Sequence, residues 1–402
     1  MGVIKKIQNR LAQRANKKAE NERYILYVCQ ETGWSYEEAK AKMDLAREAG
    51  FSYKYYAKRK IWSRTKKQLA QSQRNIELTR ERNRADREHA VEEVCKATGW
   101  SASKAREKIK EARLNCGSSF KDYYKFRLYE HTPEEQRTFL TLKVSEALIF
   151  KYNNDAQAAK TLRYKGRFAK KYDDLFHRSW FINKNLSYET FLEKIDGVED
   201  LICKPTSSTQ GKGVIKIHCG SGVTDKRDIY DRITGTDKRM ICEECILQHP
   251  DIAAFNPSSV NTIRVLTIVD DGVCHHVYAG FRMGCGDVVD NFHAGGIIAS
   301  IDVATGVTCM DAINLDGVHF PTHPKSGLPT LGFQIPHWDQ VLAITEQAAL
   351  RMEGVGMVGW DVAVTEQGVC LIEGNAEASY HIIQLPYVDA GIGMKKVVER
   401  FL

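Results

Sequence analysis

Hydrophobic positions follow two different periods along this chain, and the change comes near residue 135. Before it, apolar residues recur at the spacing of amphipathic helices, and Pro133 is the sole proline. After it, glycine becomes frequent and short stretches alternate between apolar and polar residues, as strands between turns do. The pattern therefore predicts a helical N-terminal region followed by an α+β region.

The helical region contains an internal repeat. Residues 28–35 (Val-Cys-Gln-Glu-Thr-Gly-Trp-Ser) recur as residues 94–101 (Val-Cys-Lys-Ala-Thr-Gly-Trp-Ser), an offset of 66 residues (94 − 28). In each copy, about 24–65 and 90–132, we expect a helix that ends at Thr-Gly with a glycine C-cap and a serine that caps the next helix. No acid, histidine or cysteine cluster stands at ligand spacing here, so we interpret the repeat as a scaffold or docking module.

In the α+β region the alternation predicts strands and helices whose order we give by residue range. The strands are expected at Leu201–Pro205, Val214–His218, Arg239–Ile246, Thr262–Val269, His275–Arg282, Ile297–Asp302, Trp360–Val364 and Val369–Glu373. The helices are expected at Ser145–Lys151, Gln157–Lys171, Tyr188–Lys194 and His337–Arg351.

A strand that ends in Lys204-Pro205 is followed by a loop of small residues and then at once by a second strand. No helix pattern follows the glycines, so the segment is neither a Walker motif nor a dinucleotide fingerprint. A Ser/Thr/Gly loop exposes backbone N–H groups that can close over phosphates, and Lys204 adds a positive charge beside them. A polar hairpin turn is the alternative.

Two acids interrupt apolar strands near the C-terminus. Residues 359–364 and 369–375 predict a hairpin that places Asp361 beside Glu373, and Asn375 points to the same face as Glu373. Two carboxylates and an amide oxygen suit magnesium. Ordinary surface acids are the alternative, although an unpaired carboxylate in an apolar strand is costly.

Two further segments carry charge inside apolar surroundings. Residues 240–250 are an apolar run with two acids that stops at Pro250, as a hinge strand that reads adenine edges would. Arg264 and Arg282 lie within hydrophobic strands and need anionic partners. Those partners are either internal carboxylates or phosphates whose charge grows in a transition state.

Charge and cysteine content narrow the picture further. The formal net charge is +7, and an excess of bases lies between residues 53 and 90. This excess suits an anionic partner, or else it is a solvated helical surface. The eleven cysteines are scattered, so we expect no disulfide framework, and Cys242-Glu-Glu-Cys245 reads as core strand rather than zinc site. No secretory signal or membrane span is recognisable, which favours a cytoplasmic protein.

Taken in order, these segments resemble ATP-grasp proteins, and among them the sugar-transfer-associated branch. The segments that carry the resemblance lie within residues 140–402: Lys204-Pro205 with Gln210-Gly211-Lys212-Gly213, Asn256 to Arg264, Asn291 to Gly296, Gly359-Trp360-Asp361 and Ile372 to Asn375. The resemblance implies an ATP-grasp fold, in which two α+β subdomains clasp ATP, preceded by an all-α repeat region. We place the boundaries at 1–135, 136–245 and 246–402.

The resemblance also implies roles at matching positions. Nucleotide contacts would come from Lys165, Lys204, Ser207, Gln210, Gly211, Lys212, Gly213, Glu243, Ile246 and Asp251. Magnesium, expected as two ions that Mn²⁺ can replace, would be held by Asp361, Glu373 and Asn375. Arg264 and Arg282 would be catalytic and face the transferred phosphate, and the acceptor pocket would include Asn261, Asn291, His293 and Ser379.

The chemistry that the resemblance implies is ATP-dependent ligation of a carboxylate to an amine through an acyl phosphate, with release of ADP and phosphate. The acceptor would be a glycan or small carboxylate, as in polysaccharide biosynthesis. A kinase on the same site is one alternative. Another is a nucleotide-gated binding module whose basic helices dock an anionic partner or a partner protein, with nucleic acid the less favoured partner.

Overall fold

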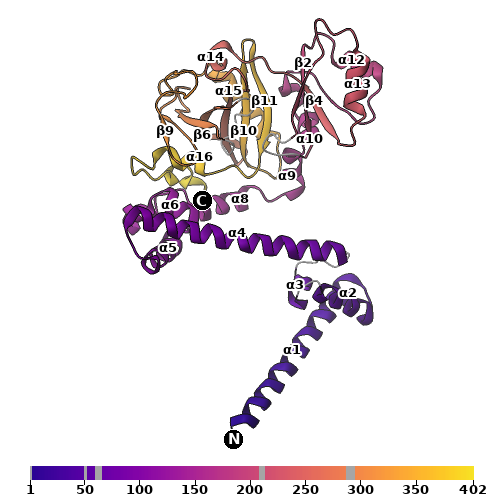
Figure 1. Cartoon of the computed structure of the whole chain (residues 1–402), viewed down its shortest axis with the longest axis vertical. Helices are drawn as coiled ribbons and strands as arrows, with labels where there is room; N and C mark the ends of the chain where they lie inside the picture. Colours follow the sequence, from indigo (N-terminus) through magenta and orange to yellow (C-terminus); the bar gives the residue numbers. More distant parts are fainter. Residues whose placement is uncertain (1, 49–51, 59–65, 208–212, 287–294) are drawn as a thin grey trace. The chain divides into compact units, whose positions relative to one another are not determined.

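The computed structural model describes residues 2–48, 52–58, 66–207, 213–286 and 295–402, which fall into two compact units, 1–89 and 90–402. Figure 1 traces both units along the sequence. The first unit contains α1 (Gly2–Thr32), α2 (Tyr36–Glu48), α3 (Tyr53–Lys58) and the start of α4 (Lys66–Thr98). Its core consists of Ile25, Val28, Ala39, Met43, Ala46, Tyr53 and Ala57.

The two repeat copies close with the same local hydrogen bonds. The hydroxyls of Thr32 and Thr98 donate to the carbonyl four residues earlier at 2.6 and 2.7 Å, and both accept from the amide two residues later at 3.2 Å. Gly33 and Gly99 follow with φ of 75° and 70°, a region that glycine occupies without strain. The predicted glycine C-caps are therefore confirmed in both copies.

The second copy belongs to the same unit as the α+β region. It contains the end of α4, then α5 (Ala102–Cys116) and α6 (Phe120–Lys125). Asp122 on α6 is fully buried and accepts hydrogen bonds from Tyr380 Oη (2.7 Å), Leu142 N (2.9 Å) and Ser119 N (2.8 Å). One carboxylate thus joins this copy to segments near both ends of the α+β region.

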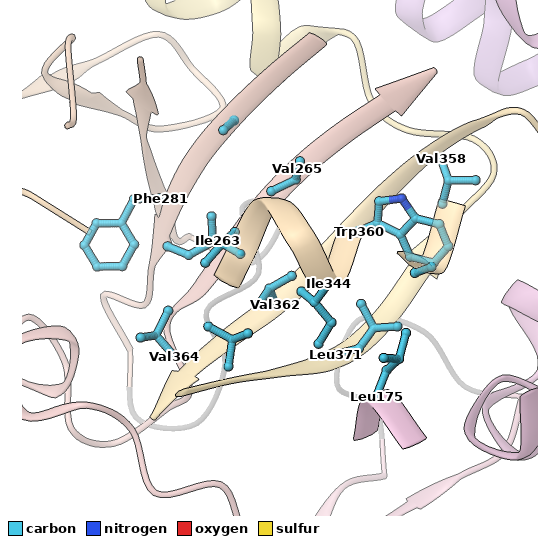
Figure 2. Packing of buried hydrophobic residues seen from close by; sticks show 14 of the residues in the cluster. Leu175, Ile263, Val265, Phe281, Ile344, Val358, Trp360, Val362, Val364 and Leu371 are labelled. Atoms are coloured by element: carbon cyan, nitrogen blue, oxygen red, sulfur yellow. The ribbon is translucent and has the colours of Figure 1, made fainter. Parts of the chain in front are cut away.

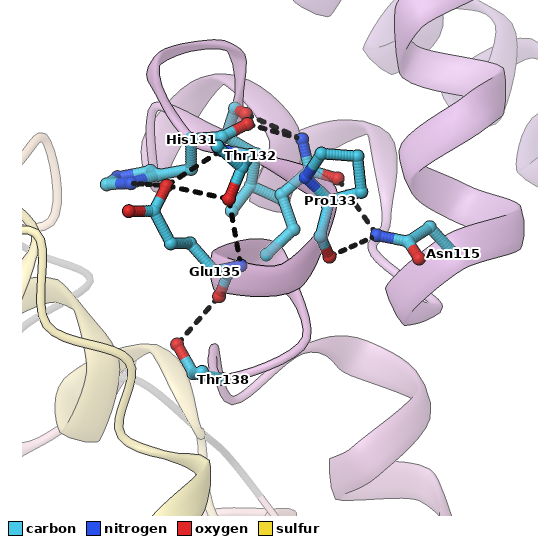
Figure 3. Close-up of polar contacts among 8 residues, drawn as sticks. Asn115, His131, Thr132, Pro133, Glu135 and Thr138 are labelled. Carbon is cyan, nitrogen blue, oxygen red and sulfur yellow. Dashed lines mark hydrogen bonds and ion pairs between the residues drawn. The ribbon is translucent and has the colours of Figure 1, made fainter.

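A capping box stabilises the short helix after the repeat. Thr132 caps α7 (Pro133–Gln136), and the Glu135 carboxylate in turn accepts a hydrogen bond from the Thr132 amide at 2.8 Å (Figure 3). The Asn115 side chain on α5 donates to the Pro133 carbonyl at 2.7 Å. These bonds fix α7 against the second repeat copy.

Two antiparallel sheets form the α+β region. The four-stranded sheet has the order β1-β4-β2-β3, from β1 (Trp180–Ile182), β2 (Asp200–Pro205), β3 (Ile215–His218) and β4 (Met240–Glu244). The seven-stranded sheet has the order β11-β10-β5-β6-β7-β8-β9. Its strands are β5 (Thr262–Asp270), β6 (Val273–Met283), β7 (Ile297–Ile301), β8 (Ala312–Ile313), β9 (His319–Phe320), β10 (Met357–Thr365) and β11 (Gly368–Asn375).

The seven-stranded sheet carries the largest core. Side chains such as Ile263, Trp360 and Leu371 pack beneath Ile344 of α15 (Trp338–Leu350) and against Leu175 (Figure 2). The helices α9 (Ala156–Arg163), α10 (Lys165–Lys171) and α11 (Asp173–Phe176) also contact β11. The remaining helices are α8 (Leu142–Tyr152), α12 (Tyr188–Lys194), α13 (Lys226–Thr234), α14 (Pro250–Ala253) and α16 (His381–Gln384), with 3₁₀ turns at Leu128–Glu130, Leu385–Tyr387, Lys395–Val397 and Glu399–Phe401.

Every predicted strand is present, with bounds shifted by a few residues, and α12 has the predicted bounds. The single helix predicted over Gln157–Lys171 is wrong. Tyr164 has φ −96° and ψ 106°, which is extended backbone. The first helix therefore ends before Tyr164, and a second helix begins at Lys165. The break matters because it sets the position of Lys165.

The charged stretch on α4 is solvated where its side chains are described. Arg74, Arg80, Arg82 and Arg84 are exposed, and Glu77, Glu81, Asp86 and Glu88 are interspersed among them. All eleven cysteines are free thiols. Within the described ranges, no helix is both long and apolar enough to cross a bilayer.

Candidate functional site

Lys204 and Glu243 face each other across the small sheet. Lys204 lies near the end of β2 and Glu243 near the end of β4, and Lys204 Nζ is 2.8 Å from Glu243 Oε1. Arg178, just before β1, places Nη2 2.7 Å from the other oxygen, Glu243 Oε2. Burial opposes ionisation of Glu243, but the charges of Lys204 and Arg178 lower its pKa to about 2. Glu243 is therefore a buried anion with two cationic partners.

The hairpin of β10 and β11 brings the two C-terminal acids together. Asp361 and Glu373 are direct cross-strand partners, and the register shifts immediately after Asp361. Arg264 is the partner of Asp361 on the other side, on β5. A β-bulge re-aims side chains next to it, and here it lies beside the acid pair.

Both interior arginines bind Asp361. Arg264 donates to it through Nε (2.6 Å) and Nη2 (2.9 Å), and Arg282 donates through Nη1 (2.9 Å). Burial would raise the pKa of Asp361, but the two guanidinium groups hold it below its ordinary value. Of the two kinds of partner that the sequence left open, the structure shows the internal carboxylate.

Glu373 is in the opposite electrostatic situation. Burial and then the neighbouring Asp361 raise the pKa of Glu373, although Arg264, Lys204 and Lys165 act against that rise. The Asn375 side-chain amide lies 3.4 Å from Glu373 Oε1. Asp361 is buried and Glu373 is half-buried, and the charge of Asp361 opposes ionisation of Glu373. Two adjacent carboxylates with an amide beside them are a donor set that a divalent cation would stabilise.

Lys165 connects the two groups of charges. It begins α10, which contacts β11, and its backbone amide donates to the Thr206 carbonyl at 3.4 Å. Burial lowers the pKa of Lys165, and the charges of Glu373 and Glu243 counter this while Lys204 adds to it. Lys165 therefore interacts electrostatically with an acid of each sheet, Glu373 and Glu243.

The other predicted residues divide into three groups. Gly213 has φ 78°, Ser207 is exposed, and Ile246 and Ser379 are half-buried in the segments after β4 and β11. Asp251 is exposed on α14. Five predicted residues lie outside the described ranges: Gln210, Gly211, Lys212, Asn291 and His293.

Asn261, which was predicted for the acceptor pocket, uses its side chain in hydrogen bonds within the protein. It is buried, and its amide nitrogen donates to the Ile252 and Asn256 carbonyls at 2.9 and 3.0 Å. Its amide oxygen accepts from Gly284 N at 3.1 Å. These bonds hold the loop before β5, and a role of Asn261 in the acceptor pocket stays a prediction.

Arg178 was missed by the sequence reasoning. Its side chain is 4% exposed, and its carboxylate partner lies 65 residues away in the chain. No local pattern marks it, because a three-residue strand follows it and no motif includes it. The sole signal was the general rule that a buried acid such as Glu243 needs cations.

No group of three His, Cys, Asp or Glu side chains that could hold a metal is found in the described part of the chain. The cluster of Asp361, Glu373 and Asn375 is not such a group, because it has two carboxylates and its third donor is an amide. A hollow of about 510 Å³ lies elsewhere, lined by Ala304, Thr305 and residues 334–340. None of the charged residues described above lines it.

The solved structures that match this chain include several ligases. The ATP-grasp ligase PsnB with its minimal precursor is 14% identical, covers 60% of this chain and 62% of its own, and gives a TM-score of 0.34. The L-amino acid ligase from Bacillus licheniformis is 12% identical, covers 59% of this chain and 45% of its own, and gives a TM-score of 0.31. The D-alanine-D-alanine ligase from Coxiella burnetii is 10% identical, covers 62% of this chain and 62% of its own, and gives a TM-score of 0.35. The chain thus spans less than two thirds of the length of these structures.

A search of curated proteins gives no match. The model of the sugar-transfer associated ATP-grasp family matches residues 180–400, which is more than half of the chain. This match contains β1 to β11 and with them Lys204, Glu243, Asp361 and Glu373. The predicted fold class is confirmed, and the prediction of an ATP-grasp enzyme agrees with it. The chain belongs to the sugar-transfer associated ATP-grasp family.

Proposed function

We propose that this protein is an ATP-dependent ligase that joins a carboxylate to an amine through an acyl phosphate, releasing ADP and phosphate. The observation that carries the proposal is the cluster of buried and half-buried charges in which Asp361 pairs with Glu373 across β10 and β11, and Lys204 and Lys165 act electrostatically on Glu373. Cations beside paired carboxylates are what a site for a nucleotide and its metal requires.

In this proposal the nucleotide lies against the small sheet. Lys204 and Lys165 contact its phosphates, and Ser207 and Gly213 belong to the loop that covers them. Glu243 near the end of β4 and the backbone of Ile246 just after this strand contact the adenine, and Asp251 contacts the ribose. The half-buried position of Ile246 beside the exposed Leu247 supports a backbone edge that is open to a base.

Magnesium would be held by Asp361, Glu373 and Asn375. The fit rests on the acid pair itself: burial and Asp361 raise the pKa of Glu373, and a divalent cation would remove that conflict. When bound, magnesium supplies charge that neutralises phosphate oxygens. Asp361 already has two guanidinium partners, so Glu373 is the carboxylate that we expect to respond most to the ion.

The residues of this chain contribute position and charge rather than a covalent bond. Arg264 and Arg282, both held by Asp361, keep two positive charges beside the acid pair. Such preorganised charge stabilises the negative charge that develops on a transferring phosphoryl group. The substrate carboxylate is the nucleophile in the first step, and the amine is the nucleophile in the second.

The test is to incubate the full chain with ATP, magnesium and a panel of carboxylates and amines, and to measure ADP, phosphate and the mass of the product. We expect equimolar ADP and phosphate and a product that retains no phosphate. A phosphorylated product without free phosphate would show a kinase instead. Unchanged turnover in Glu373→Ala would contradict the magnesium assignment.

A further inference from the structure

Arg178 is held by four groups at once. Its guanidinium donates to Glu243 Oε2 from Nε (3.1 Å) and Nη2 (2.7 Å). Nη1 donates to the carbonyls of Phe176 (3.0 Å) and Leu371 (2.9 Å), and the group stacks on the Phe176 ring at 3.5 Å. These bonds hold the guanidinium in a single orientation, with its charge on one carboxylate.

The two oxygens of Glu243 have separate cations. Lys204 takes Oε1 and Arg178 takes Oε2. The Lys204 side chain is 16% exposed and that of Arg178 is 4% exposed, so Lys204 is the partner nearer to solvent. A lysine on a flexible stem can change partners more readily than a guanidinium fixed by several bonds.

This arrangement bears on how Lys204 could reach a phosphate. If Lys204 were the only cation at Glu243, its departure would leave a buried carboxylate unpaired, which is strongly unfavourable. Because Arg178 stays on Oε2, Glu243 keeps a counterion when Lys204 leaves. Arg178 thereby lowers the free energy needed to move Lys204 from the carboxylate to a phosphate.

Arg178 also links the small sheet to the large one. Its acceptor Leu371 lies on β11, two residues before Glu373, whereas Glu243 lies on β4. The same guanidinium therefore sets the position of β4 relative to the strand that carries Glu373.

We propose that Arg178 is a positioning residue of the nucleotide site, a fixed counterion of Glu243 that releases Lys204 to the phosphates. The inference rests on the proposed function, because it takes Lys204 as the phosphate contact. It differs from a purely structural role in one respect. Loss of Arg178 should weaken binding of nucleotides that carry phosphates far more than binding of adenosine.

The experiment measures dissociation constants of ATP, ADP and adenosine by titration calorimetry with the full chain. The variants are Arg178→Met, Arg178→Lys and the double variant Arg178→Met with Glu243→Gln. Arg351→Met is the matched control, because Arg351 bridges α15 and α11 through Asp174 at 2.7 Å on the surface. Thermal melts of each variant report folding separately.

We expect Arg178→Met to weaken ATP and ADP about tenfold or more relative to adenosine, which corresponds to about 1.4 kcal/mol. Arg178→Lys should lose less ATP affinity than Arg178→Met, because it keeps the charge but not the fixed orientation. The double variant should recover the wild-type ratio of ATP to adenosine affinity, since Lys204 is then no longer held by an anion. Arg351→Met should bind all three ligands as the wild type does.

Equal loss of ATP and adenosine affinity in Arg178→Met would overturn the proposal. Arg178 would then have only a structural role, as a contact between the two sheets. An ATP-to-adenosine ratio that stays low in the double variant would also overturn it, because trapping of Lys204 could not then be the cause. Wild-type protein that binds no ATP would refute the proposed function itself, and this inference with it.

Discussion

At the scale of single residues, the contact between Lys204 Nζ and Glu243 Oε1 (2.8 Å) holds the lysine that we assign to phosphate. Lys204 is therefore already paired with an acid of the same sheet, Glu243, before any nucleotide binds. The proposed site therefore works by exchange of ion-pair partners, and its affinity depends on the difference between two charge-assisted contacts.

Replacing Lys204 tests that exchange. We expect Lys204→Met to weaken ATP binding about tenfold to a hundredfold, because a hydrogen bond to a charged group contributes about 1.5–3 kcal/mol. Titration calorimetry measures it. Lys216→Met is the control: Lys216 lies on β3 of the same sheet, 59% exposed, and pairs with Asp200. Wild-type ATP affinity in Lys204→Met would contradict the assignment.

The residues that the sequence predicted and those that it missed differ in how local their signal is. Asp361 and Glu373 could be placed side by side because a turn of known length joins their strands. Arg178 could not, because its partner is 65 residues distant and only the folded sheet brings them together. The partner of Arg264 was left open for the same reason, since register between β5 and β10 is not readable from either strand alone.

At the scale of elements, every strand predicted from the alternation of apolar and polar residues is present in the structure. The alternation was informative because each of these strands lies in a sheet with a buried face. The strands β1, β8 and β9 were not predicted, since two or three residues are too few to show a period. The break at Tyr164 was also missed. Gly166 lies two residues beyond it, but a single glycine does not fix where a helix ends, and α9 and α10 each contact β11.

The contact of α6 with the segment before α16 makes a prediction about pH. Burial opposes ionisation of Asp122, but His381 and the bonds from Ser119 and Tyr380 hold its pKa below the ordinary value of 3.8. A lowered folded-state pKa means that the ionised group stabilises the fold at pH above 3.8, and that this stabilisation disappears as pH falls through the folded-state value.

We therefore expect Asp122→Asn to lower the free energy of unfolding by about 1–3 kcal/mol at neutral pH. The gap to wild type should stay constant down to about pH 5 and shrink below about pH 4. Thermal melts over this range measure it. Asp316→Asn, an exposed partner of Lys125, is the control and should cost less than about 1 kcal/mol. A gap that persists at low pH would contradict the account.

At the scale of the whole molecule, the two repeat copies have different surroundings. The first belongs to the unit 1–89, and the second to the unit 90–402. Buried side chains of the second copy share a core with the α+β region: Val91, Val94, Ala105, Ile109, Ala112, Tyr123, Phe126 and Leu128. The sequence placed both copies in one region ending at 135, because likeness between copies says nothing about what each packs against.

Truncation separates these roles. Removing residues 1–89 should leave a chain that melts within about 4 °C of the full protein and still binds ATP. Removing residues 1–132 also deletes those eight buried side chains. At about 1.5–3 kcal/mol for each large one, the loss is comparable with the whole stability of a domain. The shorter chain should therefore not fold, and circular dichroism would show this; a stable 133–402 fragment would contradict the account.

We propose that the acid pair on β10 and β11 and the lysines beside it form one site for a nucleotide and its metal. The most direct measurement is the magnesium dependence of ATP binding by titration calorimetry, in wild type and in Glu373→Gln. Glu366→Gln is the matched control, because Glu366 is exposed on the turn of the same hairpin. The account predicts that magnesium strengthens ATP binding in wild type and in Glu366→Gln, and that Glu373→Gln loses this effect. An equal magnesium effect in all three proteins would contradict it.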